Sequence, residues 1–174
     1  RPPRSTLFPY TTLFRSAHPN IIANPPDRCY HCKKVIFRQI IREVAAPRGA
    51  DAVLCGTNLD DLADYRPGNR AAAELGVKTP IADAGLTKAD IRQLSRRLGL
   101  PTADKPAMPC LATRIPYNQP LTPDALAQVE QAEAFLRVEL HLPDCRVRHH
   151  GQIARIEVPR SEEHTSELQS RQVI

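Results

Sequence analysis

Apolar residues recur at intervals of three and four along several stretches of the chain, which is the spacing of one face of an α-helix. The longest stretch begins at Pro123, a favourable first-turn residue, and runs to Val138 with Glu133 on the flank of its apolar stripe. Another begins at Thr87, which forms a capping-box pattern with Asp90. The predicted helices span residues 29–44, 69–75, 87–98 and 123–138.

Shorter apolar patterns predict two kinds of strand. Residues 51–56 are mostly apolar and end in glycine, so we expect a buried parallel strand with Cys55 in the core. Residues 145–150 alternate instead, and residues 153–158 follow a glycine, which predicts an antiparallel hairpin. The remaining irregular segments are predicted to be a loop at 20–28 and an extended piece at 78–83.

Composition narrows the classes of function only slightly. The chain has 174 residues, a formal net charge of +5 and five cysteines. No leader-like segment is recognisable, so we expect a reduced, cytoplasmic protein whose cysteines serve metal or redox chemistry rather than disulfides. The longest apolar runs are far too short to cross a membrane, and no membrane role is expected.

Both ends of the chain differ from the rest. Residues 5–16 repeat Thr-Leu-Phe without an amphipathic period, and residues 160–170 are polar. Both strings resemble translated sequencing adapters, so we predict that 1–16 and 160–174 are foreign tails; natural disordered tails are the alternative. Without them the net charge falls to +3, because the tails carry five arginines and three glutamates. A charge this small does not favour nucleic-acid binding.

Three cysteines have surroundings that suggest chemistry. Cys29 and Cys32 lie in the predicted first turn of a helix, where free N–H groups stabilise thiolates. No strand precedes them, as a redox dithiol would require, and no second Cys/His pair follows at zinc spacing. Cys110 lies on the proline strap (residues 105–117), with Arg114 nearby, and is either a reactive or ligating thiol or a small buried hydrophobe. Together the three predict a [4Fe–4S] site with one iron open to substrate.

A cluster of polar residues follows the predicted parallel strand. Asn58, Asp60, Asp61 and Asp64 lie where ligands bind beyond the strand ends of open α/β sheets. We therefore predict a ribose, Mg²⁺ or substrate-positioning role for them. The alternative is a loop in which Asn and Asp serve turn chemistry and cap a short helix.

The predicted hairpin carries a candidate anion clamp. Arg146 and Arg148 project from one face of the strand, with Val147 on the other. Two guanidinium groups placed in this way can clamp a phosphate or a carboxylate. Spacing alone favours the simpler interpretation, a solvated edge strand.

Four motifs together are specific to one family. They are Asn-Pro-Pro-Asp-Arg-Cys-Tyr-His-Cys-Lys from position 24, Cys-Gly-Thr-Asn-Leu-Asp-Asp from 55 with Asp-Tyr-Arg-Pro-Gly from 64, Lys-Pro-Ala-Met-Pro-Cys-Leu-Ala-Thr-Arg from 105, and Arg-Val-Arg-His-His-Gly-Gln-Ile-Ala-Arg-Ile-Glu-Val from 146. Over nearly all of residues 17–159 the chain resembles the LarE family of ATP-dependent sacrificial sulfur transferases, in the PP-loop ATP pyrophosphatase superfamily.

The resemblance implies an α/β fold in two domains. Residues 17–108 would be the later part of a Rossmann-like PP-loop nucleotide domain that lacks its N-terminal strands. Residues 109–159 would begin a truncated, small α+β domain that carries substrate and sulfur-transfer groups. The family also implies a cytoplasmic homo-oligomer that acts on a small nucleotide.

The family's chemistry assigns roles to individual residues. ATP with Mg²⁺ adenylylates a carboxylate of a pyridinium dicarboxylate mononucleotide, a thiolate displaces AMP, and cleavage leaves a thiocarboxylate for the nickel-pincer cofactor of lactate racemase. Cys110 matches the sulfur-bearing cysteine, which either becomes dehydroalanine or joins Cys29 and Cys32 around a [4Fe–4S] cluster; three cysteines favour the cluster class. The substrate-side matches are Arg146, Arg148, Glu133 and, less closely, Arg114.

The sequence departs from the family in one respect. It contains no Ser-Gly-Gly-x-Asp-Ser phosphate loop, which in the family lies upstream of Asn20. We expect the parent protein to be an enzyme. We expect this chain to be inactive, because it lacks the backbone N–H groups of that loop. We also expect marginal stability, or self-association through exposed apolar edges.

Two other functions fit part of the pattern. The first is a tRNA-thiolating PP-loop sulfurtransferase, against which the low net charge argues. The second is a non-enzymatic metal-binding module built on Cys29 and Cys32. Iron and sulfide in anaerobically purified protein would favour the cluster, and stoichiometric zinc would favour the module.

Overall fold

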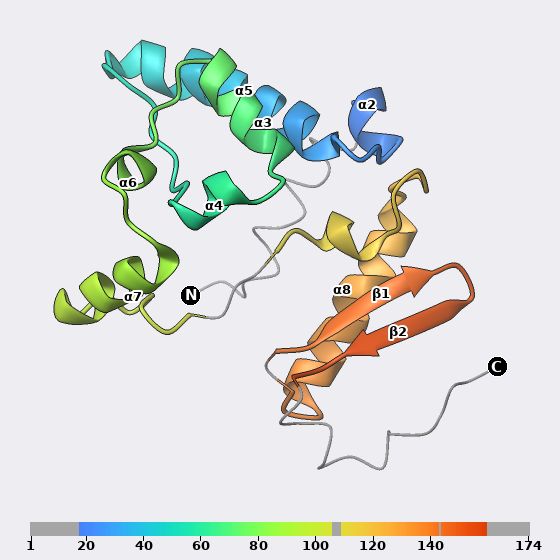
Figure 1. Ribbon diagram of the computed structural model, residues 1–174. Helices are drawn as coiled ribbons and strands as arrows, with labels where there is room; N and C mark the ends of the chain where they lie inside the picture. Colours follow the sequence, from blue (N-terminus) through green and yellow to red (C-terminus); the bar gives the residue numbers. More distant parts are fainter. Residues whose placement is uncertain (1–17, 106–108, 143, 160–174) are drawn as a thin grey trace. The chain divides into compact units, whose positions relative to one another are not determined.

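The computed structural model describes residues 18–105, 109–142 and 144–159 (Figure 1). The predicted tails at 1–16 and 160–174, and positions 106–108 of the proline strap, lie outside the described residues. The chain divides into two compact units. Of the described residues, the helical unit comprises 25–105, and the hairpin unit comprises 18–24, 109–142 and 144–159.

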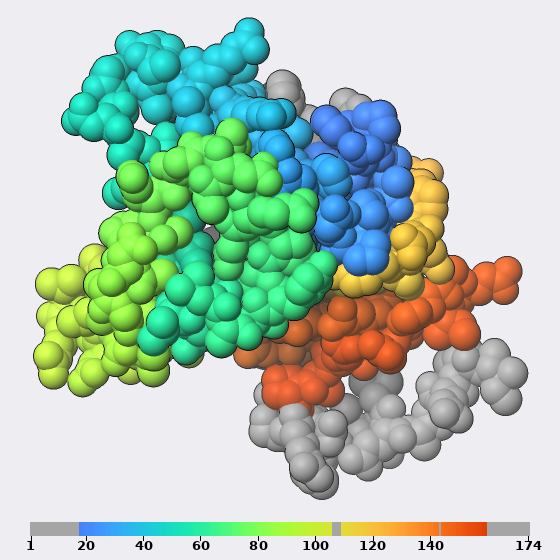
Figure 2. Space-filling view, turned by 45° about the horizontal axis from the view of Figure 1, so that its top comes forward, coloured from blue at the N-terminus to red at the C-terminus, as the bar shows by residue number. Residues whose placement is uncertain are grey.

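The helical unit is built on two helices that pack against each other. Helix α3 (Arg28–Gln39) continues through a π-helical turn, η2 (Ile40–Ala45), and a 3₁₀ turn, η3 (Ala46–Arg48). Its partner is α5 (Pro67–Glu74), and the segments that contain the two helices lie side by side in Figure 2. They approach closely at Gly68, where a Cβ atom would lie 2.6 Å from the Lys33 side chain.

The core of the helical unit lies between these two helices. Phe37 from α3, Ala72 from α5 and Val77 are buried together, and Val53 and Cys55 pack against them. The prediction that Cys55 belongs to the core therefore agrees with its packing. Apolar burial of this kind contributes about 25 cal/mol for each Å² removed from water.

The predicted strand at 51–56 is reduced to one parallel bridge between Leu54 and Lys78. Cys55 N donates to Lys78 O, and Lys78 N donates to Val53 O. Leu54 itself is 62% exposed, so the prediction of a buried strand is wrong for this side chain. A short apolar run such as 51–56 predicts a strand that is buried on both faces, whereas only one of its faces packs against a core here.

The remaining helices of this unit are α4 (Asp60–Ala63), α6 (Pro80–Asp83) and α7 (Lys88–Arg97). The prediction of an extended piece at 78–83 holds at Lys78, which forms the parallel bridge, and is wrong from Pro80 onward. Pro80 occupies the first position of a helical turn, where its fixed φ is favourable. The capping box is confirmed. Thr87 Oγ1 accepts from Asp90 N at 3.2 Å, and Asp90 Oδ2 accepts from Thr87 N at 2.9 Å.

The hairpin unit pairs one long helix with two strands. Helix α8 (Pro123–Val138) has the predicted bounds, and Thr122 caps it through a bond from Ala125 N. Strands β1 (Arg146–His150) and β2 (Ile153–Glu157) form the predicted antiparallel hairpin. The unit also holds the turn η4 (Leu111–Arg114) and a short helix, α2 (Pro19–Ile22), where a loop was predicted. Helix α2 starts at a proline in its first turn, as α6 does.

The hairpin lies on α8, which supplies the apolar cover that two strands alone lack. Leu136, Cys145 and Val147 form the buried cluster between them. By its spacing Phe135 belongs to the apolar stripe predicted for α8, yet its side chain is 56% exposed. The prediction that Glu133 lies on the flank of the stripe is also wrong, because its side chain is buried. Arg114 of η4 and Val147 of β1 bond to the Glu133 carboxylate, so the face of α8 that carries Glu133 is covered. Phe135 is two positions further on and lies on a different face of the helix.

No helix in the described ranges is long and apolar enough to cross a membrane.

Candidate functional site

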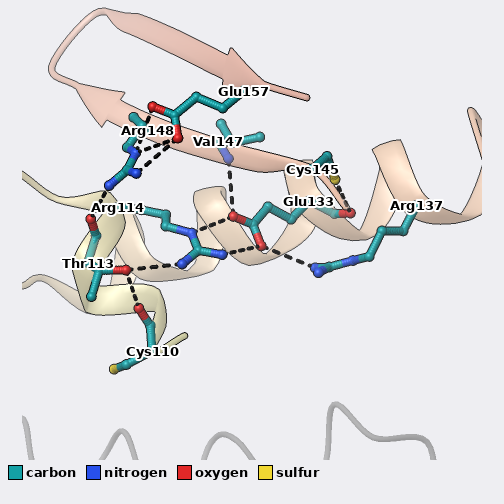
Figure 3. Close-up of polar contacts among 9 residues, drawn as sticks. All are labelled: Cys110, Thr113, Arg114, Glu133, Arg137, Cys145, Val147, Arg148 and Glu157. Carbon is teal, nitrogen blue, oxygen red and sulfur yellow. Dashed lines mark hydrogen bonds and ion pairs between the residues drawn. The ribbon is translucent and has the colours of Figure 1, made fainter. Parts of the chain in front are cut away.

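Cys110 is exposed at the start of a short, well-anchored turn. Its carbonyl oxygen accepts two hydrogen bonds from Thr113, one from the backbone N at 2.9 Å and one from Oγ1 at 2.7 Å. Figure 3 shows the sulfur pointing away from this bonded network. The turn therefore holds the backbone of Cys110 and leaves the thiol accessible.

Arg114 and Glu133 form a buried ion pair next to this turn (Figure 3). Their side chains are only 4% and 1% exposed. Arg114 Nε donates to Glu133 Oε1 at 2.6 Å, and Nη2 donates to Oε2 at 3.2 Å. Val147 N and Arg137 Nη2 donate to the same carboxylate at 3.1 and 3.3 Å. The Glu133 carboxylate thus joins η4, α8 and β1 through four charge-assisted hydrogen bonds.

Both residues were predicted to lie on the substrate side. The structure brings them together but directs them at each other. A carboxylate that already accepts four hydrogen bonds has little capacity left for a ligand. Arg114 uses its remaining terminal nitrogen on Thr113 Oγ1 at 3.0 Å.

Arg148 links the hairpin to the Cys110 turn. Its Nη1 donates to Thr113 O at 2.9 Å, while Nε and Nη2 donate to the Glu157 carboxylate at 2.9 to 3.1 Å. The hydrogen bond from Arg148 is the largest of the effects that hold the pKa of Glu157 below its ordinary value. Arg146 lies on the same face of β1 and is exposed, so Arg146 is the member of the predicted clamp that faces solvent.

Cys145 differs from Cys110 in its surroundings. It is buried in the hairpin unit, where its Sγ contacts Glu133 O at 3.8 Å. Burial raises the pKa of its thiol. A buried, protonated thiol is a packing group, so Cys145 is not a candidate for sulfur chemistry.

Cys29 and Cys32 occupy the first turn of α3, as predicted, and both are partly exposed. Arg28 Nη2 lies 3.9 Å from Cys29 Sγ as a donor. Among the described residues no group of three or more His, Cys, Asp or Glu side chains is arranged around a metal position. Cys110 belongs to the other unit, and the three-cysteine cluster stays a prediction.

The predicted nucleotide cluster makes contacts typical of a capped turn. Asn58 Oδ1 accepts from Asp61 N at 3.1 Å, and Asp61 Oδ2 accepts from Asn58 N at 3.2 Å. Asp60 Oδ2 accepts from Lys88 N at 2.8 Å, and Asp61 Oδ1 pairs with Arg66 at 3.2 Å. These bonds account for the side chains without a ligand. Their nucleotide role remains a prediction.

One contact cluster includes Tyr30 of the first motif and was not predicted. The Glu74 Oε2 atom accepts from Tyr30 OH at 2.8 Å and from Lys34 Nζ at 2.7 Å, which ties α3 to α5. The guanidinium carbon of Arg70 lies 3.7 Å from the Tyr30 ring centroid. The four-residue spacing of Tyr30 and Lys34, and of Arg70 and Glu74, places each pair on one helix face. Sequence contains no signal that the two pairs meet.

The tie between α3 and α5 should depend on pH. Hydrogen bonds from Lys34 and then Tyr30 lower the pKa of Glu74 below 4.5, and the hydrogen bond to Glu74 raises the pKa of Lys34 above 10.5. The contribution of Glu74 is complete above pH 4.5 and is lost as pH falls through the lowered value; that of Lys34 is complete below pH 10.5 and is lost above the raised value.

We therefore expect Glu74→Gln to lower the free energy of unfolding at pH 7, and the difference from the unaltered chain to shrink below pH 4.5. Urea unfolding at a series of pH values measures it. The exposed Asp51, changed to Asn, is the matched control and should leave the free energy of unfolding at pH 7 nearly unchanged. A Glu74→Gln difference that grows as the solution is acidified would contradict the assignment.

The chain is similar to several curated proteins, although no protein-family model matches it. The chain is 45% identical over 143 residues, 82% of its length, to an uncharacterised protein of Synechocystis. It is 41% identical over 149 residues, 86% of its length, to the pyridinium-3,5-bisthiocarboxylic acid mononucleotide synthase of Lactiplantibacillus plantarum. It is 37% identical over 138 residues, 79% of its length, to an uncharacterised protein of Methanocaldococcus jannaschii. In each case it covers 53% of the relative, so the chain spans about half the length of the curated relatives it matches.

Proposed function

We propose that this chain is part of a LarE-type sulfur transferase that converts carboxylates of a pyridinium mononucleotide to thiocarboxylates. The observation that carries the proposal is the exposed thiol of Cys110 on a turn anchored from below by buried charges. The similarity to the named synthase of L. plantarum supports the choice of substrate class. ATP and Mg²⁺ would supply the activated carboxylate in the whole protein.

In the simplest scheme Cys110 itself supplies the sulfur. Its thiolate attacks the acyl carbon of the adenylylated substrate, a C–S bond forms, and AMP leaves with the electron pair of the broken C–O bond. Loss of the Cα proton then breaks the Cβ–S bond. The sulfur stays on the substrate as a thiocarboxylate, and the residue becomes dehydroalanine.

The second scheme uses the three cysteines as ligands. Cys29, Cys32 and Cys110 would hold a [4Fe–4S] cluster, which when bound would supply sulfide in place of the cysteine sulfur. The donor set fits, since the first two thiols share one helical turn and the third is exposed. We favour this scheme because all three cysteines are accessible to some degree and Cys145 is not.

Substrate contacts are proposed for the outer face of the hairpin. Arg146 is exposed there and can meet the phosphate of a mononucleotide. Arg148, which is bound to Glu157 and Thr113, would contribute by holding the surface in place. Asn58, together with the neighbouring carboxylates, would face the nucleotide of ATP. The homo-oligomeric, cytoplasmic state remains part of the same proposal.

A chimera tests the proposal directly. The 149 matched residues of the L. plantarum synthase are replaced by the corresponding residues of this chain. We expect the chimera, given ATP, Mg²⁺ and the pyridinium dicarboxylate mononucleotide, to form thiocarboxylate that mass spectrometry detects. The chain by itself should show no ATP–pyrophosphate exchange, because its sequence lacks the phosphate loop. A folded chimera that exchanges pyrophosphate but forms no thiocarboxylate would refute the proposal.

A further inference from the structure

Two buried or half-buried arginines converge on one residue of the Cys110 turn (Figure 3). Arg114 Nη1 donates to the hydroxyl of Thr113 at 3.0 Å, and Arg148 Nη1 donates to its carbonyl oxygen at 2.9 Å. The same hydroxyl donates to Cys110 O at 2.7 Å. Thr113 therefore has a bond to each arginine and a bond to the backbone of the cysteine.

The hydroxyl of Thr113 is fixed in one orientation. It has a single proton, and the Arg114 guanidinium has only donors, so the proton must point at Cys110 O. Arg114 is in turn fixed by Glu133, and Arg148 by Glu157. The chain of bonds runs without a break from the core of the hairpin unit to the residue that carries the exposed thiol. A hydrogen-bonded network of this kind orients a reactive group more sharply than packing alone.

We propose that Thr113 is a positioning residue, which sets the backbone of Cys110 and so places its sulfur for sulfur transfer, whether that sulfur attacks the activated carboxylate or binds the cluster. This inference rests on the proposed function. A displacement of about 1 Å at a reacting group can cost about 10²-fold in rate. Loss of the hydroxyl should therefore reduce the rate of sulfur transfer and leave substrate affinity unchanged, because the hydroxyl bonds to Cys110 and Arg114 and to neither Arg146 nor Arg148.

The test compares Thr113→Val with Thr113→Ser. In the 174-residue chain, amide hydrogen exchange across η4 should quicken at least tenfold in the Val variant and return to the original rate in the Ser variant, which keeps the hydroxyl. In the chimera, kcat should fall about 10- to 100-fold in the Val variant with KM unchanged, and the Ser variant should recover most of it. If the Val variant does not fold, Thr113→Ala takes its place.

Thr122→Val is the matched control, because it also removes a threonine hydroxyl bond from the hairpin unit, the cap on α8. It should lower stability and leave both η4 exchange and kcat unchanged. An active chimera whose Val variant keeps its kcat overturns the positioning role while the proposed function stands. A chimera inactive with Thr113 present counts against the function instead, and unchanged exchange across η4 in the chain overturns the positioning role independently.

Discussion

Replacing Glu133 by alanine is expected to destabilise the hairpin unit by about 3–5 kcal/mol, the usual effect of removing one partner of a buried ion pair. The substitution leaves the guanidinium of Arg114 buried, at 4% exposure, without its carboxylate. It also removes the acceptor of the Val147 backbone N–H, which lies in a buried part of β1. Since whole domains are stable by only about 5–15 kcal/mol, much of the unit's stability depends on this one side chain.

Urea unfolding, followed through hydrogen exchange of the Val147 amide, measures this loss within the hairpin unit itself. Glu130→Ala is the matched control, because Glu130 lies on the same helix and is only partly buried. We expect that change to stay within about 0.5 kcal/mol, as surface substitutions usually do. Equal effects from the two changes would mean that the pair with Arg114 contributes nothing specific.

A double variant separates the ion pair from the shape of the site. Arg114→Met together with Glu133→Leu removes both charges and keeps most of the buried volume, and such replacements of buried pairs are often well tolerated. We expect the double variant to be less destabilised than Glu133→Ala alone, a non-additivity that neighbouring residues should show. This result would identify the pair as structural, although the family resemblance implies that both residues lie beside the substrate.

Sequence patterns predicted the local elements of the chain better than their burial. The bounds of α8, the capping box of α7 and the pairing of β1 with β2 follow from spacing and turn residues, which act within a few positions. The prediction of a buried strand at 51–56 is wrong in part, because a short apolar run does not show which of its faces will be covered. The short helices at 19–22 and 80–83 were not predicted, because a proline can either break a helix or begin one.

Sequence motifs indicate individual residues of the site, but not the hydrogen bonds that connect these residues. Cys110 and Arg148 were singled out from motifs, yet the residue that joins them, Thr113, is a small polar residue with no distinctive spacing. A carboxylate on a helix is usually solvated, so the sequence predicts that Glu133 lies on the flank of α8. Its burial depends on Arg114 and Val147, which lie 19 and 14 positions away. Contacts over such separations are decided by tertiary packing.

Replacing Cys110 by alanine is expected to abolish thiocarboxylate formation in the chimera, by at least about 10³-fold, because binding and orientation alone would remain. Cys55→Ala is the matched control, since that thiol packs against the core of the helical unit. Product is quantified by mass spectrometry after a fixed time with ATP, Mg²⁺ and substrate. Substantial activity without Cys110 would remove it from the chemistry.

Companion changes at Cys29 and Cys32 decide where the sulfur comes from. In the cluster scheme each of the three thiolates is a ligand, so Cys29→Ala and Cys32→Ala should be as inactive as Cys110→Ala, and each should lose iron and sulfide from anaerobically prepared protein. In the sacrificial scheme the first two variants stay active. The product then never exceeds one sulfur per protein, and the spent chain is lighter by one hydrogen sulfide at Cys110.

Because two cysteines share the first turn of α3 and Cys110 is exposed, we expect the cluster result. Active Cys29→Ala protein with a single turnover would establish the other source.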